Sequence, residues 1–168
     1  HPDYPDGVAE YLEQGRRVLV LRTFSKIYGL AGLRVGYGVG PTDVIQAISK
    51  TRRAFDVGTQ AQVAALASMN EQDELAERCS LTRAGRERLE RTLRDHGLAP
   101  AGPAVANFLF VEVGEDAPAL YQALLRQGAI VRPMGAFGAP GALRITVGTP
   151  EENAFFAEAL ASVRAATT

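Results

Sequence analysis

The 168-residue sequence has little of the chemistry that usually marks disulfide or metal proteins: one cysteine, two histidines and no tryptophan. A single cysteine excludes an internal disulfide and fits a reducing compartment, so we expect a cytoplasmic protein. We expect Cys79 itself to be a small buried residue. His1 and His96 are far apart in the sequence, and we therefore expect no metal site.

Excess charge and long hydrophobic runs are also absent. Lysine and arginine total 18 against 19 acidic residues, which gives a formal net charge of −1. This balance argues against a general nucleic-acid or anionic-membrane binder. No apolar run approaches the roughly 20 residues that cross a bilayer. We expect neither nucleic acid nor membrane as a partner.

Lysine is the scarcest of the common charged residues, with two lysines against sixteen arginines. An imine with an aldehyde can form only on an amine, so such chemistry would be restricted to Lys26 and Lys50. Lys26 has the more suggestive neighbours, because the hydroxyls of Thr23 and Ser25 flank it and Arg34 follows. Hydroxyls with a guanidinium suit a phosphate monoester. The alternative is an ordinary lysine on a solvated loop.

Apolar runs and helical periodicity alternate along the first half of the chain. They predict helices over 8–14, 42–53 and 60–70, the second capped by Thr42, and buried strands over 18–21 and 33–39. Such alternation is typical of an α/β domain with a largely parallel sheet. Lys26 then lies in the loop between two strands, where α/β folds place ligand sites.

The second half has a different pattern. A long helix is predicted over 71–96, with Leu89 and Leu93 on its apolar side and Arg86 among its solvated charges. A smaller α+β unit follows, with strands over 108–113, 130–132 and 143–147 and a helix over 117–127. A capping box at Thr149 opens the last helix, and Phe156, Leu160 and Val163 are expected on one face of it. We place the domain boundary between residues 76 and 77.

The lysine segment carries a family resemblance. Thr23-Phe24-Ser25-Lys26, followed by Gly29-Leu30-Ala31-Gly32-Leu33-Arg34-Val35-Gly36, resembles the lysine motif of fold-type I, pyridoxal-phosphate-dependent aminotransferases of class I/II. Among these it is most similar to histidinol-phosphate aminotransferases, and the similarity covers essentially the whole chain. The resemblance implies that residues 1–76 end the large, mainly parallel-sheet domain that binds pyridoxal 5'-phosphate. Residues 77–168 would form the small C-terminal α+β domain.

The resemblance also implies roles for individual residues. Lys26 would form the imine with the cofactor and then carry the proton between the substrate α-carbon and the cofactor. Thr23, Ser25 and Arg34 would bind the cofactor phosphate. Arg144, on the polar face of the predicted strand 143–147, would bind the substrate α-carboxylate.

Two further positions match residues that the family uses for the substrate. Asn107 would lie near the same carboxylate as Arg144, and Arg132 would recognise the far end of the substrate, the phosphate of histidinol phosphate. From the residues alone, Arg144 could instead be a structural ion pair or an edge-strand arginine in solvent. Arg132 could equally be a surface arginine in a loop.

Other parts of an aminotransferase site have no match in this sequence. The family needs an acidic residue on the pyridine nitrogen, a tyrosine on the ring oxygen, an aromatic side chain stacked on the ring and a glycine-rich phosphate loop. Asp3 and Tyr4 come after the usual position of the first two groups. We therefore expect the C-terminal part of an enzyme, inactive in isolation.

The expected function of the whole protein is transamination between histidinol phosphate and 2-oxoglutarate, in histidine biosynthesis, by a homodimer. Its partners would be small amino-acid or amino-phosphate substrates and a 2-oxo acid. The alternatives are an aromatic amino-acid aminotransferase, a threonine-phosphate decarboxylase, and a non-catalytic fragment or assembly module.

Overall fold

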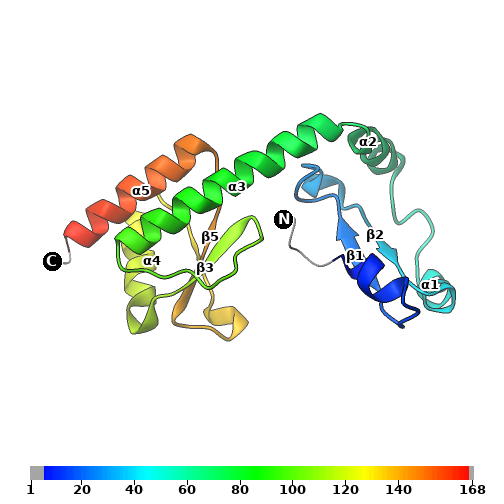
Figure 1. Cartoon of the computed structure of the whole chain (residues 1–168), viewed down its shortest axis with the longest axis horizontal. Coiled ribbons are helices and arrows are strands. Elements are labelled where there is room, and N and C mark those ends of the chain that lie inside the picture. Colours follow the sequence, from blue (N-terminus) through cyan, green and yellow to red (C-terminus); the bar gives the residue numbers. More distant parts are fainter. Residues whose placement is uncertain (1–5, 167–168) are drawn as a thin grey trace. The chain divides into compact units, whose positions relative to one another are not determined.

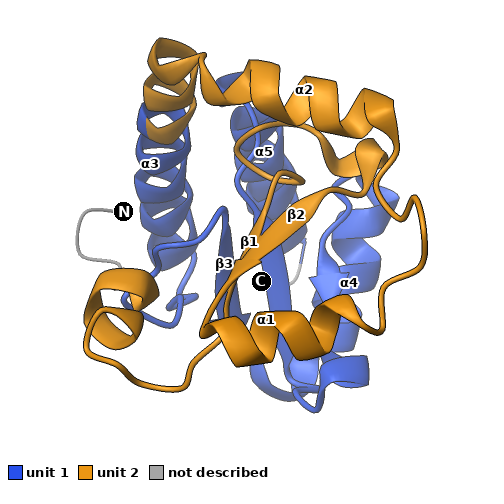
Figure 2. Cartoon of the chain, turned by 90° about the vertical axis from the view of Figure 1, so that its right-hand side faces the viewer, with its two compact units in different colours: residues 1, 80–168 blue, residues 2–79 orange. Residues whose placement is uncertain are grey.

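The computed structural model describes residues 6–166. The chain forms two compact units, one ending at Cys79 and the other beginning at Ser80 (Figure 2). This division lies inside a single helix, three residues from the boundary placed between 76 and 77. Asp3 and Tyr4 lie outside the described residues. No helix of the described part is long and apolar enough to cross a membrane.

The first unit is built around a two-stranded hairpin (Figure 1). Its elements are a π-helical turn Val8–Leu12, β1 Val20–Thr23, a 3-10 turn Ala31–Leu33, β2 Gly36–Val39, α1 Thr42–Ser49, α2 Thr59–Met69 and the start of α3 Gln72–Asp95. In the hairpin Val20 pairs with Val39 and Thr23 with Gly36. The strands approach so closely at Gly36 that a Cβ there would lie 2.7 Å from the Arg22 carbonyl oxygen.

The mixed α/β class is confirmed, but the expected parallel pairing is not found among residues 6–166. All strand pairs there are antiparallel. A parallel pair needs a crossover of a dozen or more residues that returns along the sheet, usually as a helix. The connection between β1 and β2 contains only the short turn Ala31–Leu33, so the chain doubles back.

The start of α1 also differs from the prediction. Pro41, with φ −55° and ψ 143°, is the N-cap, and Thr42 is the first helical residue and makes no capping bond. Proline fits here because its fixed φ suits a helix start and the first turn leaves N–H groups unpaired. Asp43 in the first turn accepts a hydrogen bond of 2.6 Å from Arg17, which lowers the pKa of Asp43 below its usual value.

The second unit is a three-stranded antiparallel sheet with helices on one face. Its elements, after α3, are β3 Phe108–Glu112, α4 Ala117–Arg126, β4 Arg132–Pro133, β5 Ala142–Thr146 and α5 Pro150–Ala165, with strand order β3-β5-β4. One sheet face packs into the core through Leu109, Val111, Leu143 and Ile145. The predicted apolar face of α5, formed by Phe156, Leu160 and Val163, is buried as expected.

The capping box that opens α5 is confirmed. Thr149 Oγ1 accepts a hydrogen bond from the Glu152 backbone N–H at 3.2 Å, and the Glu152 carboxylate accepts one from the Thr149 N–H at 2.8 Å. These bonds satisfy two backbone donors that a helix start leaves unpaired. They fix the point at which α5 begins.

Two expectations for α3 are wrong. Cys79 is exposed, although we expected a buried residue. Arg86, assigned to the solvated side, is only 7% exposed. It lies three residues before Leu89 and seven before Leu93, on the helix face that packs into the core, and its guanidinium donates a hydrogen bond of 2.9 Å to the Ala106 carbonyl. The bond allows the charged group to be buried, because its donor is paired.

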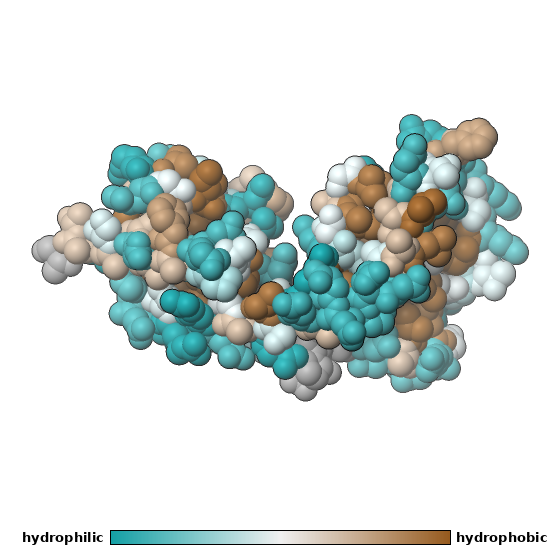
Figure 3. Space-filling model, turned by 90° about the horizontal axis from the view of Figure 1, so that it is seen from above, coloured by the Kyte–Doolittle hydropathy of each residue, from teal (hydrophilic) through white to brown (hydrophobic). Residues whose placement is uncertain are grey.

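Large hydrophobic side chains also reach the surface of both units, where brown patches interrupt the polar teal surface (Figure 3). In the first unit Phe55 is 97% exposed and Leu21 71%. In the second, Ile130 is 81% exposed. Exposed side chains of this size are available for contact with other protein.

Candidate functional site

The loop between β1 and β2 presents Lys26 to solvent. Lys26 is exposed, and its ammonium has no hydrogen-bond or ion-pair partner among residues 6–166. The loop backbone is nevertheless ordered by Gly29 N–H to Lys26 carbonyl (2.9 Å), Leu30 N–H to Phe24 carbonyl (3.0 Å) and Phe24 N–H to Val35 carbonyl (3.2 Å). The loop therefore holds the backbone of Lys26 while leaving its amine available.

A buried aromatic side chain anchors this loop. Phe24 is 5% exposed, and its ring centroid lies 4.6 Å from that of Tyr28 and 5.9 Å from that of Tyr37. Aromatic pairs at such distances contribute about 0.5–1.5 kcal/mol each beyond area burial. The residue two positions before Lys26 is thus fixed by packing.

The same hairpin carries the three predicted phosphate ligands. Thr23 Oγ1 accepts a hydrogen bond from the Ser25 N–H at 3.0 Å, which leaves its hydroxyl hydrogen free to donate. Arg34 has φ 50° and ψ 49°, the left-handed conformation, and its Nη1 donates to the Ala31 carbonyl at 2.6 Å. That conformation costs a non-glycine residue about 1–2 kcal/mol, and such strain is concentrated at functional sites.

The structure adds a residue that sequence reasoning missed. Arg78, from the start of α3, donates Nη1 to the carbonyl of Ile27, the residue after Lys26, at 2.9 Å. Arg78 and Ile27 are 51 positions apart in the sequence. No spacing or motif could have indicated this contact, because it depends on how α3 packs against the hairpin loop.

A second group of candidate residues lies on β5 and its neighbour β4. Arg132 and Arg144 are directly paired in the antiparallel register, so both lie on the sheet face opposite the core. With Tyr121 and Thr146 they line an open pocket of about 560 Å³ that has no acidic residue in its lining. Two guanidinium groups without a carboxylate favour an anionic ligand.

Arg144 is suited to such a ligand. Its guanidinium carbon lies 5.3 Å from the ring centroid of Phe108, a cation–π distance. Its Nε is buried and has no hydrogen-bond partner in the part of the chain that the structure describes. A buried donor without a partner is costly, and an anion that accepted its hydrogen bond would remove that cost. Within residues 6–166 Arg144 makes no ion pair, which disfavours the structural alternative.

Asn107 is not brought into this pocket. It precedes β3 and its carbonyl accepts a hydrogen bond from the Val147 N–H at 2.9 Å, which extends the strand pairing by one residue. Alternation along the strand places Asn107 on the face of Leu109, opposite to that of Arg144. In this unit the structure therefore groups Arg132 with Arg144 and leaves Asn107 at the end of β3.

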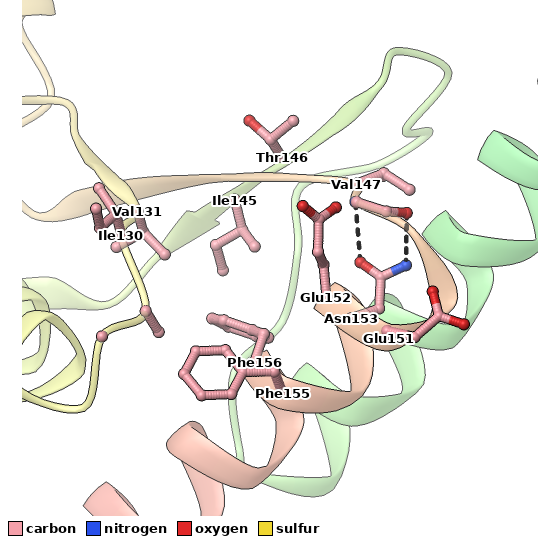
Figure 4. Close-up of a pocket in the computed structure, with 13 residues that line it drawn as sticks. Ile130, Val131, Ile145, Thr146, Val147, Glu151, Glu152, Asn153, Phe155 and Phe156 are labelled. Atoms are coloured by element: carbon pink, nitrogen blue, oxygen red, sulfur yellow. Dashed lines mark hydrogen bonds between the residues drawn. The ribbon is translucent and has the colours of Figure 1, made fainter.

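Another pocket, of about 620 Å³, lies between β5 and the start of α5 (Figure 4). Apolar side chains such as Ile130, Phe155 and Phe156 line it, together with Glu151 and Glu152. No group of acidic, histidine and cysteine side chains in residues 6–166 could hold a metal ion.

Sequence reasoning also missed Asn153, which is 4% exposed and fixes the turn that follows β5. Its amide accepts a hydrogen bond from the Gly148 N–H and donates one to the Gly148 carbonyl, both at 3.0 Å, and these bonds are the dashed lines at Asn153 in Figure 4. The pair satisfies both polar atoms of a buried amide side chain. Asn153 thereby supports the strand that carries Arg144.

Comparisons with known proteins match this architecture. A relative named histidinol-phosphate aminotransferase 2, from Pseudomonas fluorescens strain Pf-5, is 46% identical over 163 residues, covering 97% of this chain and 44% of the relative. A crystal structure of histidinol-phosphate aminotransferase from Sinorhizobium meliloti, in complex with pyridoxal-5'-phosphate, is similar with a TM-score of 0.74 at 32% identity over 90% of this chain and 42% of that one.

A double mutant of Thermus thermophilus aspartate aminotransferase is also similar, with a TM-score of 0.75 at 28% identity over 86% of this chain and 41% of that one. The chain thus spans less than half the length of these relatives. Residues 2–160 match the family model for aminotransferase class I and II. The chain belongs to the class I and II aminotransferase family.

Proposed function

We propose that the full-length protein containing this chain transfers an amino group between histidinol phosphate and 2-oxoglutarate, with pyridoxal phosphate as cofactor. The observation that carries the proposal is the hairpin, which exposes the partner-free amine of Lys26 and also carries Thr23, Ser25 and Arg34. The names of the relatives, histidinol-phosphate aminotransferases at 40–46% identity, support the choice of substrate.

The donor set of the hairpin fits the cofactor. Lys26 would hold its aldehyde carbon covalently, and the Thr23 and Ser25 hydroxyls with Arg34 would bind its phosphate through charge-assisted hydrogen bonds. When bound, pyridoxal phosphate supplies an electrophilic carbon and an electron-withdrawing ring. Lys26 Nζ, once the substrate amine has replaced it, would accept the proton of the substrate α-carbon and deliver it to the cofactor carbon that Lys26 had held.

The pocket on β4 and β5 fits the proposed substrate. Arg144 would bind the α-carboxylate of the amino-acid substrates as a bidentate partner. The role of Asn107 near that carboxylate stays a prediction from the family resemblance, because Asn107 lies outside this pocket. Arg132 would bind the distal phosphate of histidinol phosphate. The support is the register pair of Arg132 with Arg144, the absence of an acidic residue in the pocket lining, and the unpaired Nε of Arg144.

The assembly belongs to the proposal as well. The unit ending at Cys79 would complete the cofactor-binding domain, and the unit from Ser80 would be the small domain. We place the full-length protein in the cytoplasm as a homodimer. The exposed Phe55 and Leu21 support further contacts of the first unit with other protein.

The test is kinetic and uses the full-length protein. Replacement of Lys26 by Arg should abolish transamination, because a guanidinium is a poor nucleophile, whereas Lys50→Arg at the exposed end of α1 should leave it intact. Full activity in the Lys26 variant would reject the proposal.

The substrate is tested with Arg132→Gln, which should raise the KM for histidinol phosphate and leave the KM for glutamate unchanged. An equal loss with both substrates would reject the phosphate role of Arg132. Release of carbon dioxide from a phosphorylated amino acid would favour the threonine-phosphate decarboxylase alternative.

A further inference from the structure

Arg78 connects α3 to the turn that carries Lys26. Its Nη1 donates to the Ile27 carbonyl at 2.9 Å, and its Nε donates to a Glu74 carboxylate oxygen, also at 2.9 Å. We propose that Arg78 is a positioning residue that fixes the Lys26 loop for its covalent role. The inference rests on the proposed function of Lys26 and adds a residue to that site.

The position of the bonded carbonyl gives the contact its effect. Ile27 follows Lys26 directly, inside the turn closed by the hydrogen bond from the Gly29 N–H to the Lys26 carbonyl. Gly29 adopts φ +71°, and a Cβ there would lie 3.4 Å from Arg78 Nη1. The guanidinium therefore lies against both the middle and the end of the turn. Phe24 anchors the turn before Lys26, and Arg78 anchors it after Lys26.

The geometry explains why an arginine is needed at this position. Arg78 and Glu74 are one helical turn apart, with side chains 42% and 51% exposed, and an ion pair of this kind contributes little by itself. The ion pair instead orients the Arg78 side chain, because a planar guanidinium held through Nε directs Nη1 at the Ile27 carbonyl. A lysine has a single nitrogen and cannot reproduce this fork.

The same helix makes a second bond of the same kind. Arg86 donates to the Ala106 carbonyl, immediately before Asn107, at 2.9 Å. Each of these arginines thus fixes the backbone of a residue next to a candidate site residue. α3 is therefore a structural support for the candidate segments of both units and not only a connection between them.

Hydrogen exchange of the full-length protein without cofactor tests the anchor. Arg78→Met keeps the aliphatic stem and removes both bonds, and the Gly29 and Leu30 amides should then exchange about tenfold faster, which corresponds to about 1.4 kcal/mol. Arg94→Met is the matched control, because Arg94 forms an i,i+4 pair with Glu90 at 2.7 Å and donates to no loop carbonyl within residues 6–166. It should leave exchange at Gly29 and Leu30 unchanged.

The functional readout is the rate at which Lys26 is captured by pyridoxal phosphate and fixed by borohydride. Arg78→Met should lower this rate severalfold and leave the KM for glutamate unchanged, because Arg132 and Arg144 are untouched. Glu74→Gln, which keeps the Arg78 side chain, should show a smaller effect of the same sign. A melting temperature close to that of the Arg94 variant would show that Arg78→Met is folded.

The possible failures can be told apart. Unchanged amide exchange in Arg78→Met, or faster exchange with an unchanged capture rate, would overturn the positioning role. If Arg78→Met does not fold, an unchanged exchange and capture rate in Arg78→Lys would overturn it instead. Absence of capture at Lys26 in the wild-type protein would overturn the proposed function of the lysine.

Discussion

Gly85 lies in the middle of α3, and its replacement by alanine should destabilise the protein, contrary to helix propensity. Alanine is favoured over glycine in a helix by about 0.8–1.0 kcal/mol. A Cβ at Gly85, however, would lie 2.7 Å from Val147 Cγ1 and 3.0 Å from Asn153 Nδ2. A contact of 2.7 Å between carbon atoms is far inside their optimal separation of about 3.5–4.0 Å.

The net effect follows from the two opposing terms. Overpacking of a core costs about 1–3 kcal/mol, and displacement of the Asn153 amide weakens its bonds to Gly148, each of which contributes about 0.5–1.5 kcal/mol. After the gain in helix propensity is subtracted from these costs, Gly85→Ala should lower the free energy of unfolding by about 1–2 kcal/mol. Urea unfolding followed by circular dichroism measures this as a lower midpoint at constant m.

Two further variants separate packing from propensity. Ala84→Gly, at the exposed neighbouring position, should cost about 1 kcal/mol, the ordinary penalty for glycine in a helix. Val147→Ala removes the obstructing methyl group, so the double variant with Gly85→Ala should be more stable than the sum of the single effects by about 1 kcal/mol. A stabilising Gly85→Ala, or strict additivity in the cycle, would show that Val147 and Asn153 do not restrict the side chain at position 85.

Other regions give predictions of the same kind. Asn153→Ala should lower the free energy of unfolding in urea by about 2–4 kcal/mol, because two hydrogen bonds are lost and the N–H and carbonyl of Gly148 are left unpaired. A decrease of less than about 0.5 kcal/mol would contradict this. Phe55 is 97% exposed and has φ 61°, a left-handed conformation that glycine adopts without strain. Phe55→Gly should therefore raise the free energy of unfolding in urea by about 0.5–1 kcal/mol. A lower free energy of unfolding would show that the conformation of Phe55 is not strained. The hydrogen bond from Arg17 lowers the pKa of Asp43 below its usual 3.8, so its stabilisation is present above that pH and lost as the pH falls through the folded-state pKa. Asp43→Asn should therefore lower the melting temperature at pH 7, and the difference should shrink as the pH falls below 3.8; a difference that does not change with pH would contradict the assignment.

Local chemistry made much of this structure predictable. The capping box at Thr149 and the apolar face of α5 depend on residues three to four positions apart, and both were correctly predicted. The position of Lys26 in a loop between two strands likewise follows from the apolar runs on either side of it.

The remaining features depend on contacts between distant segments. The burial of Arg86 is decided by the Ala106 carbonyl, 20 residues away, and the bond from Arg78 to Ile27 spans 51 residues. The antiparallel pairing of β1 and β2 depends on a turn whose conformation at Arg34 is uncommon for arginine. Neither periodicity nor propensity carries information of this kind.

Peptide mapping determines directly whether Lys26 forms the covalent bond to the cofactor. The full-length protein is incubated with pyridoxal phosphate, reduced with borohydride, digested and analysed by mass spectrometry. The cofactor mass should appear on the peptide containing Lys26 and be absent in Lys26→Arg, and the Lys50 peptide should stay unmodified. Labelling at Lys50 or at another amine in place of Lys26, or no labelling at all, would contradict this assignment.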